Sequence, residues 1–100
     1  KDNPMIELWY EVRDKNSLNM PDNLTISPWG DLIVCEDNPD LNRLWGINSS
    51  GNPYLIAENN YSGSEFAGVC FSPIDNTMFV NLQGNGMTLS ISGNWENLII

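Results

Sequence analysis

The sequence contains no histidine and very few basic residues. Without histidine, these 100 residues cannot supply a Ser-His-Asp triad, a histidine general base or a histidine-ligated zinc ion. Four Lys and Arg stand against 13 Asp and Glu, giving a formal net charge of −9. Nucleic acids and anionic membrane surfaces bind clustered basic residues, so neither is an expected partner. An acidic surface either binds divalent cations or keeps the protein soluble, and composition alone favours solubility.

Long hydrophobic runs and closely spaced cysteines are also missing. The longest apolar runs, such as Leu32–Cys35 and Leu98–Ile100, are far shorter than the roughly 18 residues of a membrane-spanning helix. No targeting segment is visible. Cys35 and Cys70 lack the spacing of a C-x-x-C metal motif and lie in apolar, strand-like runs. We expect them to be small buried hydrophobic residues, and the sequence leaves a disulfide between them open.

Short apolar segments bounded by Gly, Pro, Asn and Asp predict an all-β chain. Residues 23–27 alternate between apolar and polar, whereas residues 31–36 are apolar on both faces, as in a strand covered on both sides. The predicted strands are residues 5–12, 23–27, 31–36, 43–49, 53–58, 68–72, 77–82 and 87–92. Turn residues between them predict antiparallel sheets.

Two stretches of the chain are related in sequence. NLTISP (23–28) aligns with GVCFSP (68–73) at an offset of 45, and LIV (32–34) aligns with MFV (78–80) at an offset of 46. A period of about 40–50 residues with four strands per unit is typical of a β-propeller blade. The alternative is a chance similarity between two hairpins, because Ser-Pro turns are common.

On the propeller interpretation, the chain forms antiparallel four-stranded sheets that make up about two blades. Residues 23–58 would form one full blade, residues 65–100 most of the next, and residues 1–12 the outer strand of the blade before. Propellers close with about four to eight blades. Fewer blades leave apolar faces uncovered. We therefore expect a fragment of a larger propeller, with the remaining blades as its partners, and we expect the fragment to self-associate through open sheet faces.

Three phrases of the sequence resemble the C-terminal portion of the PhoX-type alkaline phosphatases, a family of secreted bacterial β-propeller enzymes. They are MPDNLTISPWGDLIVCED (20–37), SEFAGVCFSPIDNTMFVNLQGNG (64–86) and LSISGNW (89–95). The resemblance implies a periplasmic or extracellular phosphomonoester hydrolase that acts on a phosphate ester. It also implies calcium and iron cofactors, held in a central channel by carboxylates from several blades.

The resemblance implies roles for individual residues. Asp22, Asp37 and Glu65 match family positions, and with Glu36 they lie at strand ends that a channel mouth would gather; all four are candidate metal ligands. Oxygen ligands of this kind suit calcium and iron(III). Gln83 matches the glutamine of the family's Val-Asn-x-Gln phrase and is a candidate substrate-binding residue. Each carboxylate alone is as well explained as an exposed turn residue.

The chain also departs from the family pattern. Residues 84–86 read Gly-Asn-Gly instead of His-Pro-Gly, and the Arg-Pro-Glu segment expected to supply a phosphate-binding arginine does not occur. The iron-binding cysteine has no counterpart, since Cys35 and Cys70 are placed within strands. We therefore expect the isolated chain to be inactive as a phosphatase. The alternative is a propeller-type binding or scaffold domain with no catalytic activity.

Overall fold

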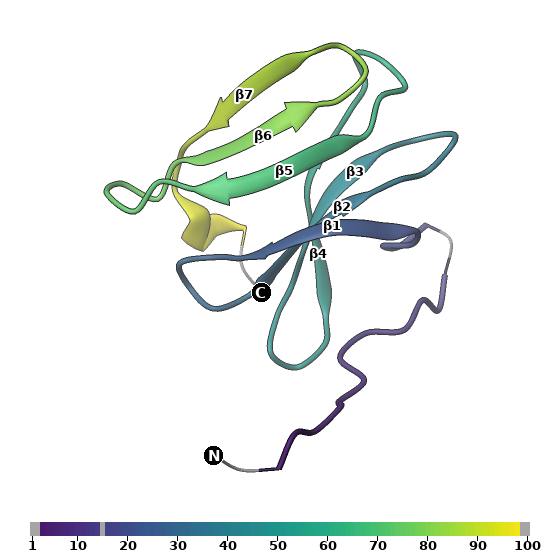
Figure 1. Cartoon of the computed structure of the whole chain (residues 1–100), viewed down its shortest axis with the longest axis vertical. Coiled ribbons are helices and arrows are strands. Elements are labelled where there is room, and N and C mark those ends of the chain that lie inside the picture. The colour runs from purple at the N-terminus through teal and green to yellow at the C-terminus, as the bar shows by residue number, and fades with distance from the viewer. Residues whose placement is uncertain (1–2, 15, 99–100) are drawn as a thin grey trace.

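A computed structural model describes residues 3–14 and 16–98 and shows seven strands in two antiparallel sheets (Figure 1). The first sheet has the order β1-β2-β3-β4 and the second the order β5-β6-β7. The strands are β1 (Pro21–Ile26), β2 (Leu32–Glu36), β3 (Arg43–Ile47), β4 (Pro53–Glu58), β5 (Phe66–Phe71), β6 (Met78–Leu82) and β7 (Met87–Ile91). One turn of 3₁₀-helix, η1 (Trp95–Asn97), follows. The predicted all-β class is confirmed.

Short turns connect strands that are consecutive in sequence. Between β1 and β2, the Ser27 amide donates to the Asp31 carbonyl at 2.8 Å, and the Asp31 amide donates to Ser27 Oγ at 3.0 Å. Between β5 and β6, the Ser72 amide donates to the Thr77 carbonyl at 2.8 Å. Because such connections are short, consecutive strands within each sheet pair with each other, whereas β4 and β5 belong to different sheets. No helix in the described residues is long and apolar enough to cross a membrane.

The sequence repeat is also a repeat of strand register. Residues aligned at offsets 45 and 46 occupy equivalent pairs in the two sheets: Thr25–Ile33 matches Cys70–Phe79, and Ile26–Leu32 matches Phe71–Met78. The correspondence extends to the third strand, where Val34–Trp45 of the first sheet matches Val80–Leu89 of the second. The similarity therefore covers three strands of each sheet, which is more than a shared hairpin turn.

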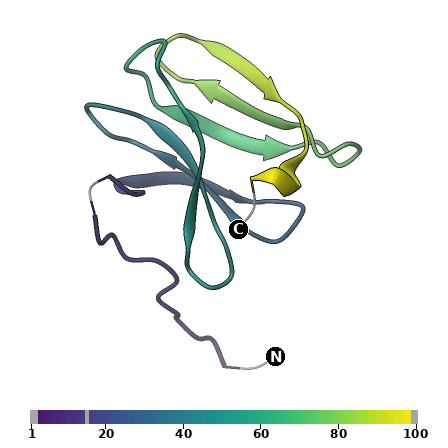
Figure 2. The same cartoon turned by 180° about the vertical axis from the view of Figure 1, so that it is seen from behind.

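The two sheets pack face to face, with β5 lying against β1 and β2 (Figures 1 and 2). Ile33, Cys35 and Leu44 of the first sheet are fully buried in this interface. The second sheet contributes Phe66, Val69, Met78, Val80 and Leu82. Burial of apolar surface at this interface holds the sheets together.

Three aromatic rings close one end of the interface. Trp29 from the β1–β2 turn, Phe71 from β5 and Trp95 from η1 pack with ring centroids 5.3 to 6.1 Å apart. Edge and tilted contacts of this kind add to the stabilisation from buried area. The carboxylates described below lie at the opposite end of β1.

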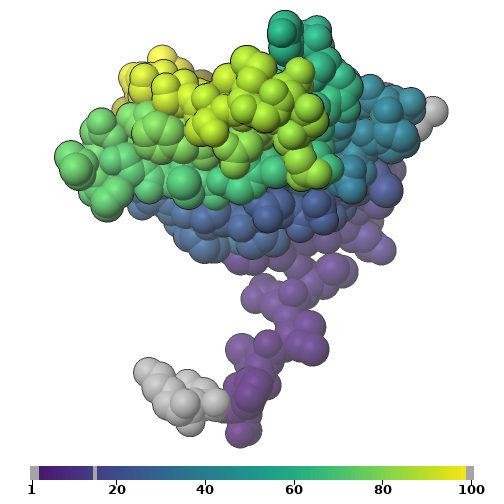
Figure 3. Space-filling model, turned by 45° about the horizontal axis from the view of Figure 1, so that its top comes forward, coloured from purple at the N-terminus to yellow at the C-terminus, as the bar shows by residue number. Residues whose placement is uncertain are grey.

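Residues 3–14 contain no strand, so the strand expected over residues 5–12 does not form here. The segment is attached through side chains: Trp9 Nε1 donates to the Asn48 carbonyl at 2.6 Å, and the Tyr10 hydroxyl donates to the Leu18 carbonyl at 2.7 Å. It extends away from the body of the molecule (Figure 3). A strand requires an edge to pair with. The assignment of residues 1–12 to a preceding blade thus stays a prediction, as do the other blade boundaries. Residues 1, 2, 99 and 100, which these assignments include, lie outside the described part.

Candidate metal centre

Three carboxylates from separate parts of the chain meet at one end of the sheets. Asp22 lies in β1, Asp37 directly follows β2, and Glu65 directly precedes β5. One oxygen of each carboxylate lies within 4.8 Å of the others. Three of the four candidate metal ligands are therefore brought together, and they come from both sheets.

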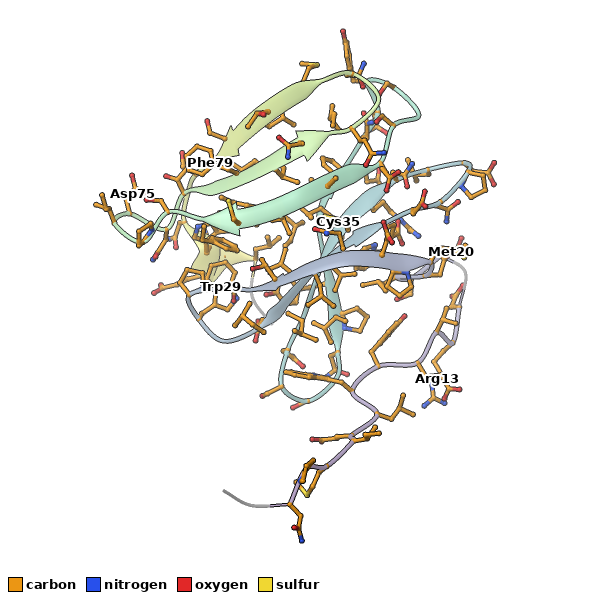
Figure 4. All side chains as sticks on the ribbon, viewed as in Figure 1. Arg13, Met20, Trp29, Cys35, Asp75 and Phe79 are labelled. Carbon is orange, nitrogen blue, oxygen red and sulfur yellow. The ribbon has the colours of Figure 1, made fainter. Side chains whose placement is uncertain are left out.

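Backbone hydrogen bonds fix the ends of the strands that carry this acidic cluster (Asp22, Asp37 and Glu65). The Asp37 amide donates to the Met20 carbonyl at 2.9 Å, and the Gln83 amide donates to the Glu65 carbonyl at 3.0 Å. Met20 marks this end of β1, and Trp29 marks the other (Figure 4). Gln83, the candidate substrate-binding residue, is exposed and lies beside Glu65.

Glu36 does not join the acidic cluster. Its side chain is fully buried and forms a salt bridge with Arg43, at 2.9 Å between Oε1 and Nε. Trp45 Nε1 and the Asn19 amide donate to the other carboxylate oxygen at 3.1 and 3.0 Å. Successive side chains of a strand point to opposite faces, so Glu36 and Cys35 lie on different sides of the first sheet. Glu36 was predicted as a metal ligand at the end of β2; it lies at that end, but its carboxylate is bound by Arg43 and is outside the acidic cluster.

The salt bridge also anchors the segment that leads into β1. Arg43 Nη1 donates to the Asn16 carbonyl at 2.8 Å, and Nη2 donates to the Ser17 carbonyl at 3.0 Å. Its guanidinium lies 5.0 Å from the centroid of the Trp45 ring. Arg43 is thus a supporting residue that sequence reasoning missed. The sequence did contain a signal for this role: Arg43 is the first residue of an otherwise apolar strand, and the strand before it ends in the acidic residue Glu36.

Burial and nearby negative charges perturb the protonation of Glu65. The pKa of Glu65 is raised, first by partial burial, then by the negative charges of Asp37 and Asp22 and by a hydrogen bond to Asp22. Since Arg43 is engaged by Glu36, it is not available to neutralise the cluster. A bound cation would relieve this repulsion.

The two cysteines differ in environment, and both are free thiols. Burial raises the pKa of Cys35 to about 12, and the charges of Asp22 and Glu65 contribute to the shift. A thiol with this pKa is protonated near neutral pH and is a poor metal ligand in that state. Cys70 is exposed, so the prediction that it is buried was wrong. It lies on the face of β5 that points away from the first sheet, and nothing in the described chain covers that face.

One of the comparisons with known proteins gave a match. A family model described as alkaline phosphatase PhoX matches residues 4–86. The chain belongs to the alkaline phosphatase PhoX family. The matched range includes all three carboxylates of the acidic cluster, and the resemblance seen in the sequence phrases is confirmed. Comparison with curated proteins and with solved structures gave no match.

The donor set of this PhoX-family chain suits a hard cation. All three side chains offer carboxylate oxygens, and all three remain at least partly accessible to solvent. Calcium takes about six to eight oxygen ligands, and iron(III) also favours oxygen donors. Three carboxylates fit such an ion but supply only part of its coordination shell.

Proposed function

We propose that this chain forms part of the metal-binding mouth of a metal-dependent phosphomonoester hydrolase. One observation carries the proposal: Asp22, Asp37 and Glu65 converge from two sequence-related sheets. Membership of the PhoX family supplies the reaction class. Calcium and iron are the proposed ions, following the resemblance of the sequence to this family, and the periplasm or the cell exterior is the proposed location.

Hydrolysis of a phosphate monoester requires neutralisation of the phosphoryl charge and a nucleophile near neutral pH. A bound metal ion supplies both without histidine, of which this chain has none. Asp22, Asp37 and Glu65 would hold the ion at the open end of the sheet pair. Gln83, exposed beside Glu65, would offer a neutral amide to the phosphate oxygens.

The proposed centre is incomplete within this chain. Three carboxylates leave several positions of a calcium shell to be filled. No arginine is free at the acidic cluster, because Arg43 is held by Glu36 and Arg13 lies in the N-terminal segment. We therefore propose that further blades of a parent propeller supply the remaining ligands and a phosphate-binding arginine. The chain alone would bind cations weakly and would not turn over a phosphate ester.

A calcium titration of the purified chain, followed calorimetrically, tests the proposed site. The double variant Asp37→Asn with Glu65→Gln should bind calcium at least tenfold more weakly than the wild type. Glu11→Gln is a matched control, since Glu11 is an exposed acidic residue in the N-terminal segment. Equal calcium affinity of the wild type and the double variant would contradict the proposed site. The acidic cluster would then be a solvated surface, as expected for a scaffold domain.

A turnover assay tests the proposed inactivity. The chain is mixed with calcium, iron(III) and a chromogenic phosphate ester, and release of the chromophore is followed. No turnover above the protein-free control is expected. Turnover that the double variant abolishes would show that three carboxylates suffice and that the site is complete without further blades.

A further inference from the structure

The first sheet carries an apolar face that is only half covered. This open face consists of six side chains that point away from the second sheet: Leu24, Ile26, Leu32, Val34, Trp45 and Ile47. Tyr10 and Leu18 pack over the part formed by β2 and β3, where Val34, Trp45 and Ile47 are buried. On the β1 half, Leu24 and Ile26 are 58% and 57% exposed. A hollow of about 220 Å³ borders this half.

The sequence repeat shows what packs on such a face. The residues of the second sheet equivalent to Leu24, Ile26, Leu32 and Val34 are Val69, Phe71, Met78 and Val80. These four pack in the interface with the first sheet, in the same cluster as Ile33 and Cys35. Strands β1, β2 and β5 make this contact. On the open face, β1 is the strand that is left uncovered. The matching partner is therefore a sheet face equivalent to that of Ile33 and Cys35.

The chain itself carries one further face at the equivalent position in the fold. On the outer face of the second sheet, Cys70, Phe79 and Asn81 stand at the positions equivalent to Thr25, Ile33 and Cys35. Phe79 is 39% exposed, and Cys70 is exposed (Figure 4 labels Phe79 on this sheet). The other residues of this face on β6 and β7 are polar: Asn81 on β6 and Thr88 on β7 stand at the positions equivalent to Cys35 and Leu44, and Ser90 lies opposite Phe79, so Phe79 is the large apolar residue of this face.

We propose that the open face of one copy of this chain binds the outer face of the second sheet of another copy. The contact would repeat the packing already present between the two sheets and would bury Leu24, Ile26 and Phe79. Such an interface is heterologous, since it joins two different surfaces, and it generates rings or open chains of copies. The net charge of −9 opposes association, so added salt should strengthen it.

Sedimentation velocity of the full chain tests the proposal, in reducing buffer without added metal. Ile26→Lys blocks the open face and Phe79→Lys blocks the outer face; Ile74→Lys is the matched control, in an exposed turn outside both faces. We expect the wild type and the control to form larger species as concentration rises, and each blocked variant to stay monomeric. An equimolar mixture of the two blocked variants should form dimers and nothing larger. Unchanged far-UV circular dichroism confirms that each variant is folded.

The thiol of Cys70 provides a second readout. Its reaction with a thiol reagent should slow at least tenfold when the wild type associates and should stay fast in the Phe79→Lys variant. Cys35 is buried and does not interfere. A wild type that stays monomeric at all concentrations overturns the proposal. Association of Phe79→Lys equal to that of the wild type also overturns it, because it would show that two open faces pair with each other.

Discussion

Replacing Glu36 by glutamine should be among the most destabilising single substitutions in this protein. The carboxylate is fully buried and accepts hydrogen bonds from the Arg43 side chain and amide, from Trp45 Nε1 and from the Asn19 amide. A glutamine of the same shape removes the negative charge, and its NH₂ group faces donors instead of offering an acceptor. The guanidinium of Arg43 would remain buried without a counter-charge.

The size of the effect follows from this burial. Breaking a buried ion pair by removing one partner costs about 3–5 kcal/mol. Domains of this size are stable by about 5–15 kcal/mol in total, so the loss is a large fraction of the free energy of unfolding. With a urea m-value of about 1.5 kcal/mol/M, the unfolding midpoint should fall by about 2–3 M.

Urea unfolding followed by tryptophan fluorescence measures this shift, and Trp45 itself reports on the site. Glu11→Gln removes the same charge from an exposed position and should change the free energy of unfolding by less than about 0.5 kcal/mol. A loss below about 1 kcal/mol for Glu36→Gln, with an unchanged m-value, would refute the reasoning. Glu36 would then be no more important than a surface carboxylate.

Three further predictions concern single features of the structure. In the metal-free protein, Asp37→Asn with Glu65→Gln should raise the free energy of unfolding by a few tenths of a kcal/mol, or about 1–2 °C in melting temperature, because it removes repulsion. Since the folded pKa of Glu65 is raised, this gain should be absent at a pH below the unfolded value and appear as pH rises through the folded one. The pKa of Cys35 in the folded protein is about 12, against 9.0 unperturbed. Its contribution to stability is therefore complete below pH 9 and is lost as the pH rises to 12. Between pH 9 and 12, the urea midpoint of Cys35→Ala should fall less than that of the wild type. Gly46→Ala should lower the free energy of unfolding by about 1–3 kcal/mol, because its methyl group would collide with the Tyr54 ring.

Local sequence patterns were sufficient to predict most of the strands. Turn residues bound each apolar segment from residue 23 onward, and all seven strands form close to the predicted ranges. The exception is residues 5–12, which have strand-forming composition and no strand. Strand propensity describes how a residue fits a pleated surface, while a strand exists only when another edge pairs with it. That second condition is not local, so the sequence of the segment could not decide it.

The acidic cluster was predicted from family resemblance and strand position, and its membership depended on the faces of the strands. Asp22, Asp37 and Glu65 were expected together and lie together. Glu36 was grouped with them because it too lies at a strand end, but its side chain is on the other face of the first sheet, where it binds Arg43. Cys35 and Cys70 show the same effect: both lie in apolar runs, and only the first faces the other sheet. Which face a neighbouring sheet covers is decided by packing, which the local pattern does not contain.

The acidic cluster therefore depends on the packing between the sheets as much as on the residues that compose it. Asp22 and Asp37 belong to the first sheet, and Glu65 begins the second, so their oxygens come within 4.8 Å only because β5 lies against β1 and β2. One direct bond, from the Gly68 amide to Asn23 Oδ1 at 3.0 Å, ties these strands together close to the cluster. The apolar interface also holds the two sheets together, and Cys35 is buried in it close to Asp22 and Glu65. Two related sheets that must bury their faces against each other thus bring their acidic strand ends together, and the position of the cluster is a consequence of the repeat.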